Sequence, residues 1–274
     1  MPRLQLSHDE LQERALFVRR DIIALLARAQ SGHSGGPLSS TDFGTALFFH
    51  EINVNPERLD DPQRDLWHFS IGHVTPVIYS LMAERGYFPL ADLLGFRQMR
   101  GHLQGHPSKH DTPGIEVSSG SLGQGLSVCC GMALGSRHDG NPRRVYCVMG
   151  DGEQQEGQIW EASMFGAHYK LDNLCGIIDY NRKQIDGDVQ DVMGIAPLAD
   201  KWRAFEWNDV TQGLLKPLVF ALIVSLMGCY HGLRTTGGTQ GVGRSTTQAM
   251  VMATVMIFVL DLMITNVFVS QGGS

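Results

Sequence analysis

A chain of 274 residues with a net charge of −6 is long enough for one large domain or two smaller ones. The acidic balance, with an isoelectric point of about 6.0, gives no indication of a nucleic-acid-binding protein. The five cysteines form no CxxC pair and the N-terminus lacks the apolar core of a signal peptide, so we expect a cytoplasmic body with reduced thiols.

The first hundred residues are predicted to be mainly helical. Ser7 and Glu10 have the spacing of a capping box, which predicts a helix through about Ala29. A glycine-rich loop at 32–37 follows this helix. Further helices are predicted at Thr41–Glu51, Gly72–Arg85 and Leu90–Gln98, and a histidine-rich polar loop at Gly101–Gly114.

A glycine-containing helix is predicted at Ser121–His138. Each glycine inside a helix costs about 1 kcal/mol relative to alanine. Four glycines in one helix therefore indicate that its backbone packs very closely on a ligand or on another helix.

A strand, a helix and a second strand come next, at Arg144–Met149, Gln155–Lys170 and Leu174–Asp179. This order is typical of a βαβ unit, so we expect an α/β fold in which helices flank a parallel sheet. Ligands of such sheets collect at the carboxyl ends of the strands.

Asp151 and Asn181 follow the ends of these two strands. A carboxylate and an amide on neighbouring strand ends are hard oxygen ligands of the kind that Mg²⁺ prefers when it is held against a diphosphate. Gly150 and Gly152 allow backbone N–H groups to approach a phosphate closely. The alternative is an ordinary capped turn at each residue.

The last part of the chain has a different composition. Residues 206–274 contain only six charged side chains, which sum to zero: Glu206, Asp209, Lys216, Arg234, Arg244 and Asp261. Two apolar runs lie in this tail, Leu214–Leu233 and the 21-residue Ala249–Val269. A run of about 20 apolar residues matches the thickness of a bilayer. The tail is predicted to be a transmembrane helical hairpin in the inner membrane, with a buried helix pair in a soluble core as the alternative.

Six ordered motifs in the body resemble those of the thiamine-diphosphate enzymes, specifically the N-terminal, diphosphate-binding half of transketolase. The similarity covers about residues 8–205, and the histidines favour transketolase over other branches of the superfamily. The motifs are S-G-H-S-G-G-P-L (31–38), I-G-H (71–73), G-H-P (105–107), S-S-G-S-L-G-Q-G (118–125), G-D-G-E-Q-Q-E-G (150–157) and D-Y-N-R-K-Q-I-D-G (179–187).

The resemblance implies a set of cofactor-binding residues for thiamine diphosphate and Mg²⁺. The Mg²⁺ ligands would be Asp151, Asn181 and the backbone carbonyl of Lys183, and Gly152 would contact a phosphate. Gly120, Ser121 and Leu122 match the loop that packs on the pyrimidine ring of the cofactor, and Ser121 can cap a helix at the same time. Glu156 matches a carboxylate that couples paired active sites, with a favourable position at a helix N-terminus as its alternative.

The resemblance also implies that His33, His73 and His106 are active-site histidines. Imidazole titrates near neutral pH and can move protons on sugar hydroxyls and near the thiazolium. His33 and His106 would face the donor sugar, and His73 would lie near the thiazolium. An alternative for the histidine-rich loop is a metal site formed by His102, His106 and His110.

Activity of the implied kind requires a second chain. The pyrimidine-binding domain of the family, with its glutamate, is absent from this sequence, and the body has the layout of the first chain of a split transketolase. We expect a transferase component that acts on sugar phosphates, with two active sites at the interface with its partner.

The tail resembles the C-terminal hairpin of permease subunits from Mla/MCE-type lipid-transport systems. The matching motifs are G-L-L-K-P-L-V-F (213–220), G-C-Y-H-G-L (228–233) and T-G-G-T-Q-G-V-G-R-S-T-T-Q-A (236–249). The sequence is therefore interpreted as a chimera, with an incomplete transketolase domain at 1–205 and a permease-like tail at 206–274. The alternatives are a membrane-embedded fragment of a lipid transporter and a non-functional fusion.

Overall fold

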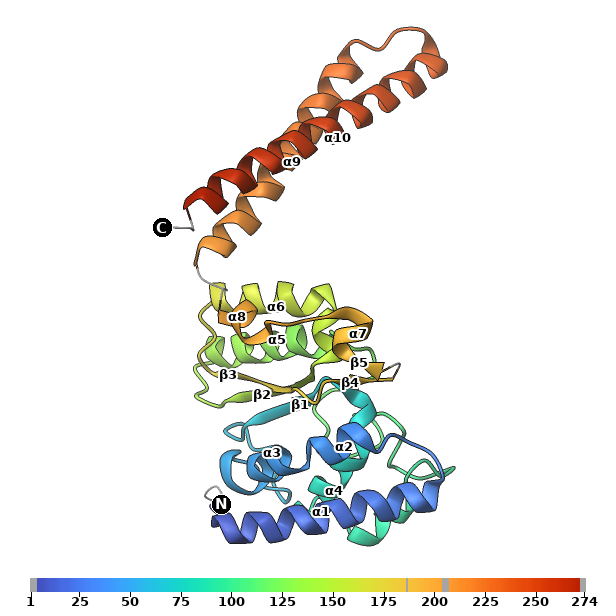
Figure 1. Ribbon diagram of the computed structural model, residues 1–274, viewed down its shortest axis with the longest axis vertical. Coiled ribbons are helices and arrows are strands. Elements are labelled where there is room, and N and C mark those ends of the chain that lie inside the picture. The colour runs from blue at the N-terminus through green and yellow to red at the C-terminus, as the bar shows by residue number, and fades with distance from the viewer. Residues whose placement is uncertain (1–3, 186, 204–206, 272–274) are drawn as a thin grey trace. The chain divides into compact units, whose positions relative to one another are not determined.

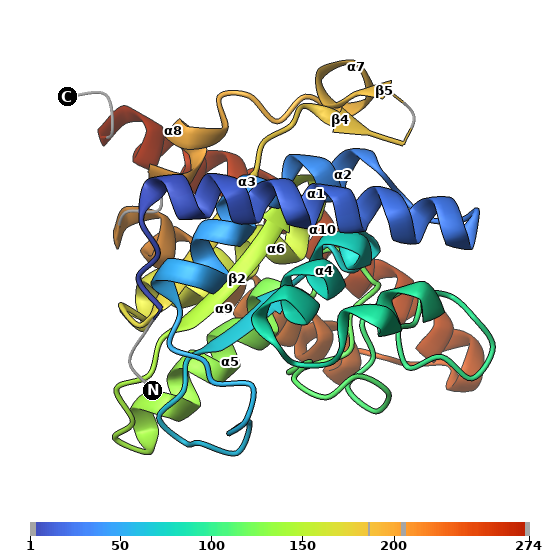
Figure 2. The same cartoon turned by 90° about the horizontal axis from the view of Figure 1, so that it is seen from below.

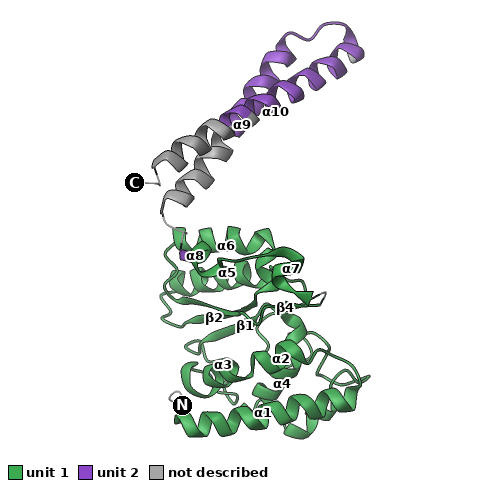
Figure 3. Cartoon of the chain, in the orientation of Figure 1, with its two compact units in different colours: residues 1–202 green, residues 203–274 purple. Residues whose placement is uncertain are grey.

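The structure is a computed structural model that describes residues 4–185, 187–203 and 207–271. Within these ranges, the side chains of residues 207–219, 239, 258 and 261–271 are not described. The chain divides into two compact units, Met1–Trp202 and Arg203–Ser274 (Figure 3).

The first unit contains a three-stranded parallel sheet with the strand order β1-β2-β3. Its strands are β1 (Leu66–Phe69), β2 (Val145–Gly150) and β3 (Leu174–Asp179). The pairs Phe69–Val148 and Gly150–Asp179 set the register, so the carboxyl ends of all three strands lie at one edge. The predicted βαβ unit and parallel sheet are confirmed.

Helices cover both faces of this sheet (Figure 1). One face carries α5 (Gly125–His138) and α6 (Gly157–His168), and the other carries the N-terminal helices, which lie in front of β2 in Figure 2. The latter are α1 (His8–Ala29), α2 (Gly35–Ser39), α3 (Thr41–Ala46) with its π-helical continuation η1 (Leu47–Glu51), and α4 (Thr75–Arg85).

Short elements complete the first unit. Three are 3₁₀ turns, namely η2 (Gly72–Val74), η3 (Leu90–Gly95) and η4 (Gly152–Gln155). The antiparallel pair β4 (Lys183–Gln184) and β5 (Gly187–Asp188) precedes α7 (Val189–Met193) and α8 (Leu198–Arg203). Most predicted helices are present, although Leu90–Gln98 forms only the 3₁₀ turn η3.

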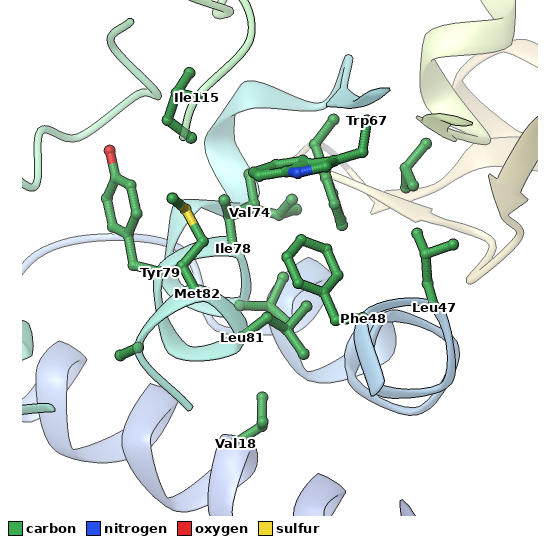
Figure 4. Packing of buried hydrophobic residues seen from close by; sticks show 14 of the residues in the cluster. Val18, Leu47, Phe48, Trp67, Val74, Ile78, Tyr79, Leu81, Met82 and Ile115 are labelled. Atoms are coloured by element: carbon green, nitrogen blue, oxygen red, sulfur yellow. The ribbon is translucent and has the colours of Figure 1, made fainter. Parts of the chain in front are cut away.

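Two apolar clusters lie on opposite faces of the sheet. Trp67 and Phe69 of β1 belong to one cluster, while Leu66 belongs to the other. Figure 4 shows Phe48 next to Trp67 in the first cluster, and the two ring centroids are 4.9 Å apart. Full burial on both faces explains why β1 lacks the alternating pattern that predicts a strand from sequence.

The capping box at the start of α1 is confirmed. The Ser7 backbone N–H donates to Glu10 Oε2 at 2.8 Å, and the Glu10 N–H donates to Ser7 Oγ at 3.4 Å. The two bonds satisfy backbone donors that would otherwise lack partners at the helix N-terminus.

The glycine-containing helix begins later than predicted. α5 starts at Gly125 with Gln124 as its N-cap, so the prediction that Ser121 caps this helix is wrong. Gly123 in the preceding turn has a φ of +85°. A β-carbon on Gly125 would lie 2.4 Å from Ser70 Cβ, so the helix backbone packs directly on the end of β1, as the glycine content indicated.

The second unit contains α9 (Trp207–Leu233) and α10 (Gly238–Gln271). The two helices contact one another and are joined by a turn in which Gly237 and Gly238 have φ values of +92° and +62°. The predicted order of helix, glycine-rich turn and helix is therefore present.

The predicted membrane span at Ala249–Val269 is not supported. Among the residues that the structure describes, none of the helices is both long and apolar enough to cross a bilayer. Asp261 lies outside the described side chains.

Asp21 on α1 generates a prediction about stability and pH. Burial, followed by the charge of Glu84 on α4, raises the pKa of Asp21 to about 6, and Arg20 opposes this shift. Arg14 pairs with Glu84 at the same place. Because the folded-state pKa lies above the value of about 3.9 in an unfolded chain, folding favours the protonated form, and this contribution to stability is lost as the pH rises through 6.

We expect Asp21→Asn to reduce the loss of stability between pH 5 and pH 8 by about 1 kcal/mol, after discounting for the solvent exposure of Asp21. The measurement is urea unfolding at both pH values. Asp9→Asn, on the exposed first turn of the same helix, is the matched control and should leave the difference unchanged. A pH dependence of Asp21→Asn equal to that of the wild type contradicts the prediction.

Candidate functional site

Asp151 lies at the carboxyl end of β2 and is 2% exposed. Its carboxylate accepts hydrogen bonds from the backbone N–H groups of Gly152, at 2.7 Å, and Arg182. Asn181 Oδ1 accepts from the Lys183 N–H at 2.8 Å. The structure therefore brings Asp151 to the loop 181–183, as predicted, and also shows the capped turns that were the alternative.

Burial raises the pKa of Asp151, and the nearby charge of Asp179 adds to this effect. The hydrogen bonds from Arg182 and Gly152 act in the opposite direction. A buried carboxylate beside a second carboxylate is stabilised by a bound cation. The oxygen atoms of Asp151, Asn181 and the Lys183 carbonyl are hard donors that fit Mg²⁺.

The glycines beside Asp151 are in close contact with neighbouring segments. A β-carbon on Gly150 would lie 2.9 Å from Ile71 Cγ2, and one on Gly152 would lie 3.1 Å from Gln184 Oε1. A side chain at either position would therefore displace a neighbour. The two glycines of the G-D-G motif therefore allow close packing at this edge of the sheet.

Asp179 fixes the first histidine motif to the same edge of the sheet. The hydroxyls of Ser39 and Ser40 each donate to the Asp179 carboxylate at 2.7 Å. Asp179 is 7% exposed, and its backbone carbonyl accepts from the Asp151 N–H at 3.1 Å. This role was not predicted from the sequence, because Ser39 and Ser40 are about 140 residues away from Asp179 along the chain.

The three predicted active-site histidines lie close together. The ring centroids of His33 and His73 are 5.2 Å apart. Burial lowers the pKa of His73, with further lowering by His33 and His106, and burial followed by Arg97 and His33 lowers the pKa of His106. His73 and His106 are therefore mainly neutral near pH 7, which suits them to accept or donate a proton.

The loop 118–125 packs on the turn that carries His73. A β-carbon on Gly72 would lie 2.8 Å from both the Gly120 nitrogen and Ser119 Oγ, and one on Gly120 would lie 3.6 Å from the His106 ring. Ser121 is exposed, and Leu122 packs on the apolar cluster behind the site. Of the three residues predicted to contact the pyrimidine ring, Gly120 therefore lies beside His106.

Glu153 was not identified from the sequence. Its carboxylate is 1% exposed and accepts hydrogen bonds from Ser70 Oγ, from the Gly123 N–H at 2.7 Å and from the Gly150 N–H at 3.2 Å. Burial raises the pKa of Glu153, and these donors oppose the shift. The G-D-G-E-Q-Q-E-G motif contains two glutamates, and the sequence alone does not show that Glu153 is buried while Glu156 is exposed.

Glu156 is the N-cap residue of α6, and it makes no side-chain capping hydrogen bond. Its side chain lies against Gly123, where an added β-carbon would be 2.7 Å from Glu156 Cβ. Glu156 therefore lies at the N-terminus of α6, as its alternative predicted, and next to the loop that contains Ser121 and Gly123.

The alternative metal site in the histidine-rich loop is not supported. Among the described residues, no group of three or more His, Cys, Asp and Glu side chains is arranged to hold a metal ion. His102 Nε2 instead lies 3.1 Å from Asp92 Oδ2, and its ring packs edge-on against Phe88.

Comparison with known proteins identifies the family of the chain. The family described as "Transketolase, thiamine diphosphate binding domain" matches residues 12–214. The chain is 42% identical over 201 residues to a subunit of the apulose-4-phosphate transketolase of Actinobacillus succinogenes, covering 73% of both chains. It is 40% identical over 199 residues to "6-deoxy-6-sulfo-D-fructose transketolase subunit SqwG" of Clostridium sp., covering 73% of this chain and 72% of the relative.

Solved structures give the same result. Transketolase from Leishmania mexicana matches with a TM-score of 0.68 and 30% identity, covering 73% of this chain and 31% of its own. The chain spans about a third of the length of the solved transketolases that it matches. The fold and site thus define a transketolase-type α/β domain. The chain belongs to the thiamine-diphosphate-binding domain family of transketolase, as predicted.

A second family, described as "Permease MlaE", matches residues 194–267. This match covers about a quarter of the chain and overlaps the transketolase match over residues 194–214. The predicted resemblance of the tail is therefore present, over a short segment.

Glu153→Ala tests the role of the buried carboxylate. The substitution leaves Ser70 Oγ and the N–H groups of Gly123 and Gly150 without their acceptor, and each buried unpaired donor costs about 1–3 kcal/mol. We expect the free energy of unfolding of the first unit to fall by about 3 kcal/mol in urea titrations. Glu156→Ala, in the same motif but exposed, is the control and should change it by less than about 0.5 kcal/mol. Equal effects of the two substitutions would refute this role.

Proposed function

We propose that this chain is the N-terminal subunit of a two-chain transketolase, which transfers a two-carbon ketol group between sugar phosphates with thiamine diphosphate and Mg²⁺. The observation that carries the proposal is the convergence of Asp151, the loop 181–183 and the three histidines at one edge of the sheet. Its acidic end suits a metal–diphosphate group, and its imidazoles suit a polyhydroxylated substrate.

In this proposal, Asp151, Asn181 and the Lys183 carbonyl bind Mg²⁺, and the Gly152 backbone binds the diphosphate. Thiamine diphosphate, when bound, supplies the carbanion-stabilising chemistry. The pyrimidine ring is oriented by Gly120, Ser121 and Leu122. The carboxylate of Glu156 couples this active site to a second one.

The histidines handle protons at the substrate. Burial and the neighbouring imidazoles lower the pKa of His73 and His106, so both rings are available as proton acceptors near neutral pH. We propose that His33 and His106 bind the hydroxyls of the donor sugar and that His73 lies at the thiazolium.

A partner chain supplies the pyrimidine-binding domain in this proposal. Three of the relatives are named as subunits of a transketolase, which supports a split enzyme. Their names specify sugars that carry a phosphate or a sulfo group. We therefore propose ketose and aldose substrates with a terminal oxyanion, and a body that works in the cytoplasm with its cysteines reduced.

The proposed cofactor site is tested by calorimetric titration of thiamine diphosphate with and without Mg²⁺. We expect Mg²⁺-dependent binding that Asp151→Ala abolishes and Asn181→Ala weakens about ten-fold or more, since each removes a metal ligand. Binding should also weaken as the pH falls, because protonation of Asp151, whose pKa is raised, removes its charge. Asp172→Ala is the control, since Asp172 is exposed and lies before the start of β3, at the opposite end of that strand from Asp179. Absence of thiamine diphosphate binding by the wild-type protein in the presence of Mg²⁺ would refute the proposal.

We also propose that residues 206–274 are foreign to the transketolase body. The permease match and the separate compact unit that begins at Arg203 support this proposal. A lipid-transporter fragment with an incidental body and a non-functional fusion are its alternatives. Mass spectrometry of native cells should detect a peptide that spans the Phe205–Glu206 bond if the fusion exists in the organism. Detection of the two parts only in separate polypeptides would show that it does not.

A further inference from the structure

Gln155 makes two hydrogen bonds with a single side-chain nitrogen. Its Nε2 donates to Gln184 Oε1 at 2.9 Å and to the Met193 backbone carbonyl at 2.8 Å. A carbonyl oxygen only accepts hydrogen bonds, so the atom that faces Met193 is the amide nitrogen, and this fixes the orientation of the Gln155 amide. Both hydrogens of Nε2 are therefore used, one for each partner.

The two partners of Gln155 lie at opposite ends of one excursion of the chain. Gln184 is the last residue of β4, and Met193 is the last residue of α7. Figures 1 and 2 both show α7 beside β4 and β5. The hairpin of β4 and β5 contains only two residue pairs, and an isolated two-stranded hairpin is at best marginally stable in water. Gln155 therefore ties together the two ends of a segment whose own hairpin is short.

This tie lies next to the candidate metal ligands. Gln155 ends η4, the turn that begins directly after Asp151, and Gln184 directly follows the loop 181–183. The Gln155 amide thus joins the segment that carries Asp151 to this loop without use of a metal-ligand atom. Another bond joins the same two segments, from the Arg182 N–H, but its acceptor is the Asp151 carboxylate, which is itself a candidate ligand.

We propose that Gln155 is a positioning residue that holds the loop 181–183 against Asp151 and thereby sets the affinity of the site for Mg²⁺. The proposal rests on the function proposed above and adds a residue outside the ligand set. Groups that orient metal ligands contribute to metal affinity, because a ligand already held in place loses less conformational freedom when the metal binds. The two bonds of Gln155 restrict the loop before a cation arrives.

The variant Gln155→Met tests the proposal, because methionine keeps the length of the side chain and cannot donate a hydrogen bond. Gln158→Met is the matched control. Gln158 is half-buried like Gln155, and its amide also makes two side-chain bonds, from Gln124 at 2.7 Å and to Ser127 Oγ at 2.7 Å. Each variant loses two hydrogen bonds, so a merely structural role would give both the same effect.

The first measurement is hydrogen exchange at the loop 181–183, on the full chain without cofactor or metal. We expect Gln155→Met to speed exchange of the Lys183 and Val189 N–H groups about five-fold or more, because both donate to acceptors in this loop. Gln158→Met should leave both rates unchanged. Equal rates in Gln155→Met and the wild type overturn the proposal.

The second measurement is calorimetric titration of Mg²⁺ in the presence of excess thiamine diphosphate. We expect Gln155→Met to weaken Mg²⁺ binding about five-fold or more, since the loop that supplies two of the ligands is no longer held. Gln158→Met should change the Mg²⁺ affinity by less than about two-fold, because its amide bonds to α5 and the turn before it rather than to the loop.

Faster exchange together with weaker Mg²⁺ binding in Gln155→Met alone supports the proposal. Changes of the same size in Gln158→Met overturn it, because they would reflect a general loss of stability. Mg²⁺ binding by Gln155→Met within about two-fold of the wild type also overturns it. Wild-type protein that binds no thiamine diphosphate with Mg²⁺ refutes the proposed function instead, and the exchange rates then decide alone whether Gln155 holds the loop.

Discussion

The buried carboxylate of Glu153 is the interaction on which the arrangement of the site depends. Burial of an ionised group is costly unless its oxygens are hydrogen-bonded. The donors that offset this cost are Ser70 at the end of β1, Gly123 in the loop before α5 and Gly150 at the end of β2. Because all three segments bond to the same carboxylate, their relative positions are fixed. The loop 118–125 therefore has a defined position on the sheet.

The charges of the site are divided between two ends. Asp151 and Asp179 form an acidic end at the carboxyl ends of β2 and β3, where the pKa of Asp151 is raised. Arg97 places a positive charge beside His106, whose pKa is lowered. The acidic end suits a cation, and the mainly neutral imidazoles of His73 and His106 suit proton transfer.

Much of this arrangement could be predicted from the sequence because its signals are local. The Ser7–Glu10 capping box, the βαβ order and the positions of Asp151 and Asn181 each depend on spacing within a few residues or one strand–helix–strand unit. The start of α5 and the strand β1 were not predicted correctly. Gly125 begins the helix because its backbone packs on Ser70, and a four-residue strand buried on both faces has no periodic pattern.

The sequence by itself determined the family, the parallel α/β fold and the residues that could bind a metal–diphosphate group, because these follow from motif order and short-range spacing. Only the tertiary structure decided which of these residues meet. The bonds from Ser39 and Ser40 to Asp179, and the place of Arg97 between Ser31 and Gly105, join segments far apart in the chain. Burial and pairing are properties of the packed chain, and they distinguish a structural carboxylate such as Glu153 from the exposed carboxylates of the same sequence.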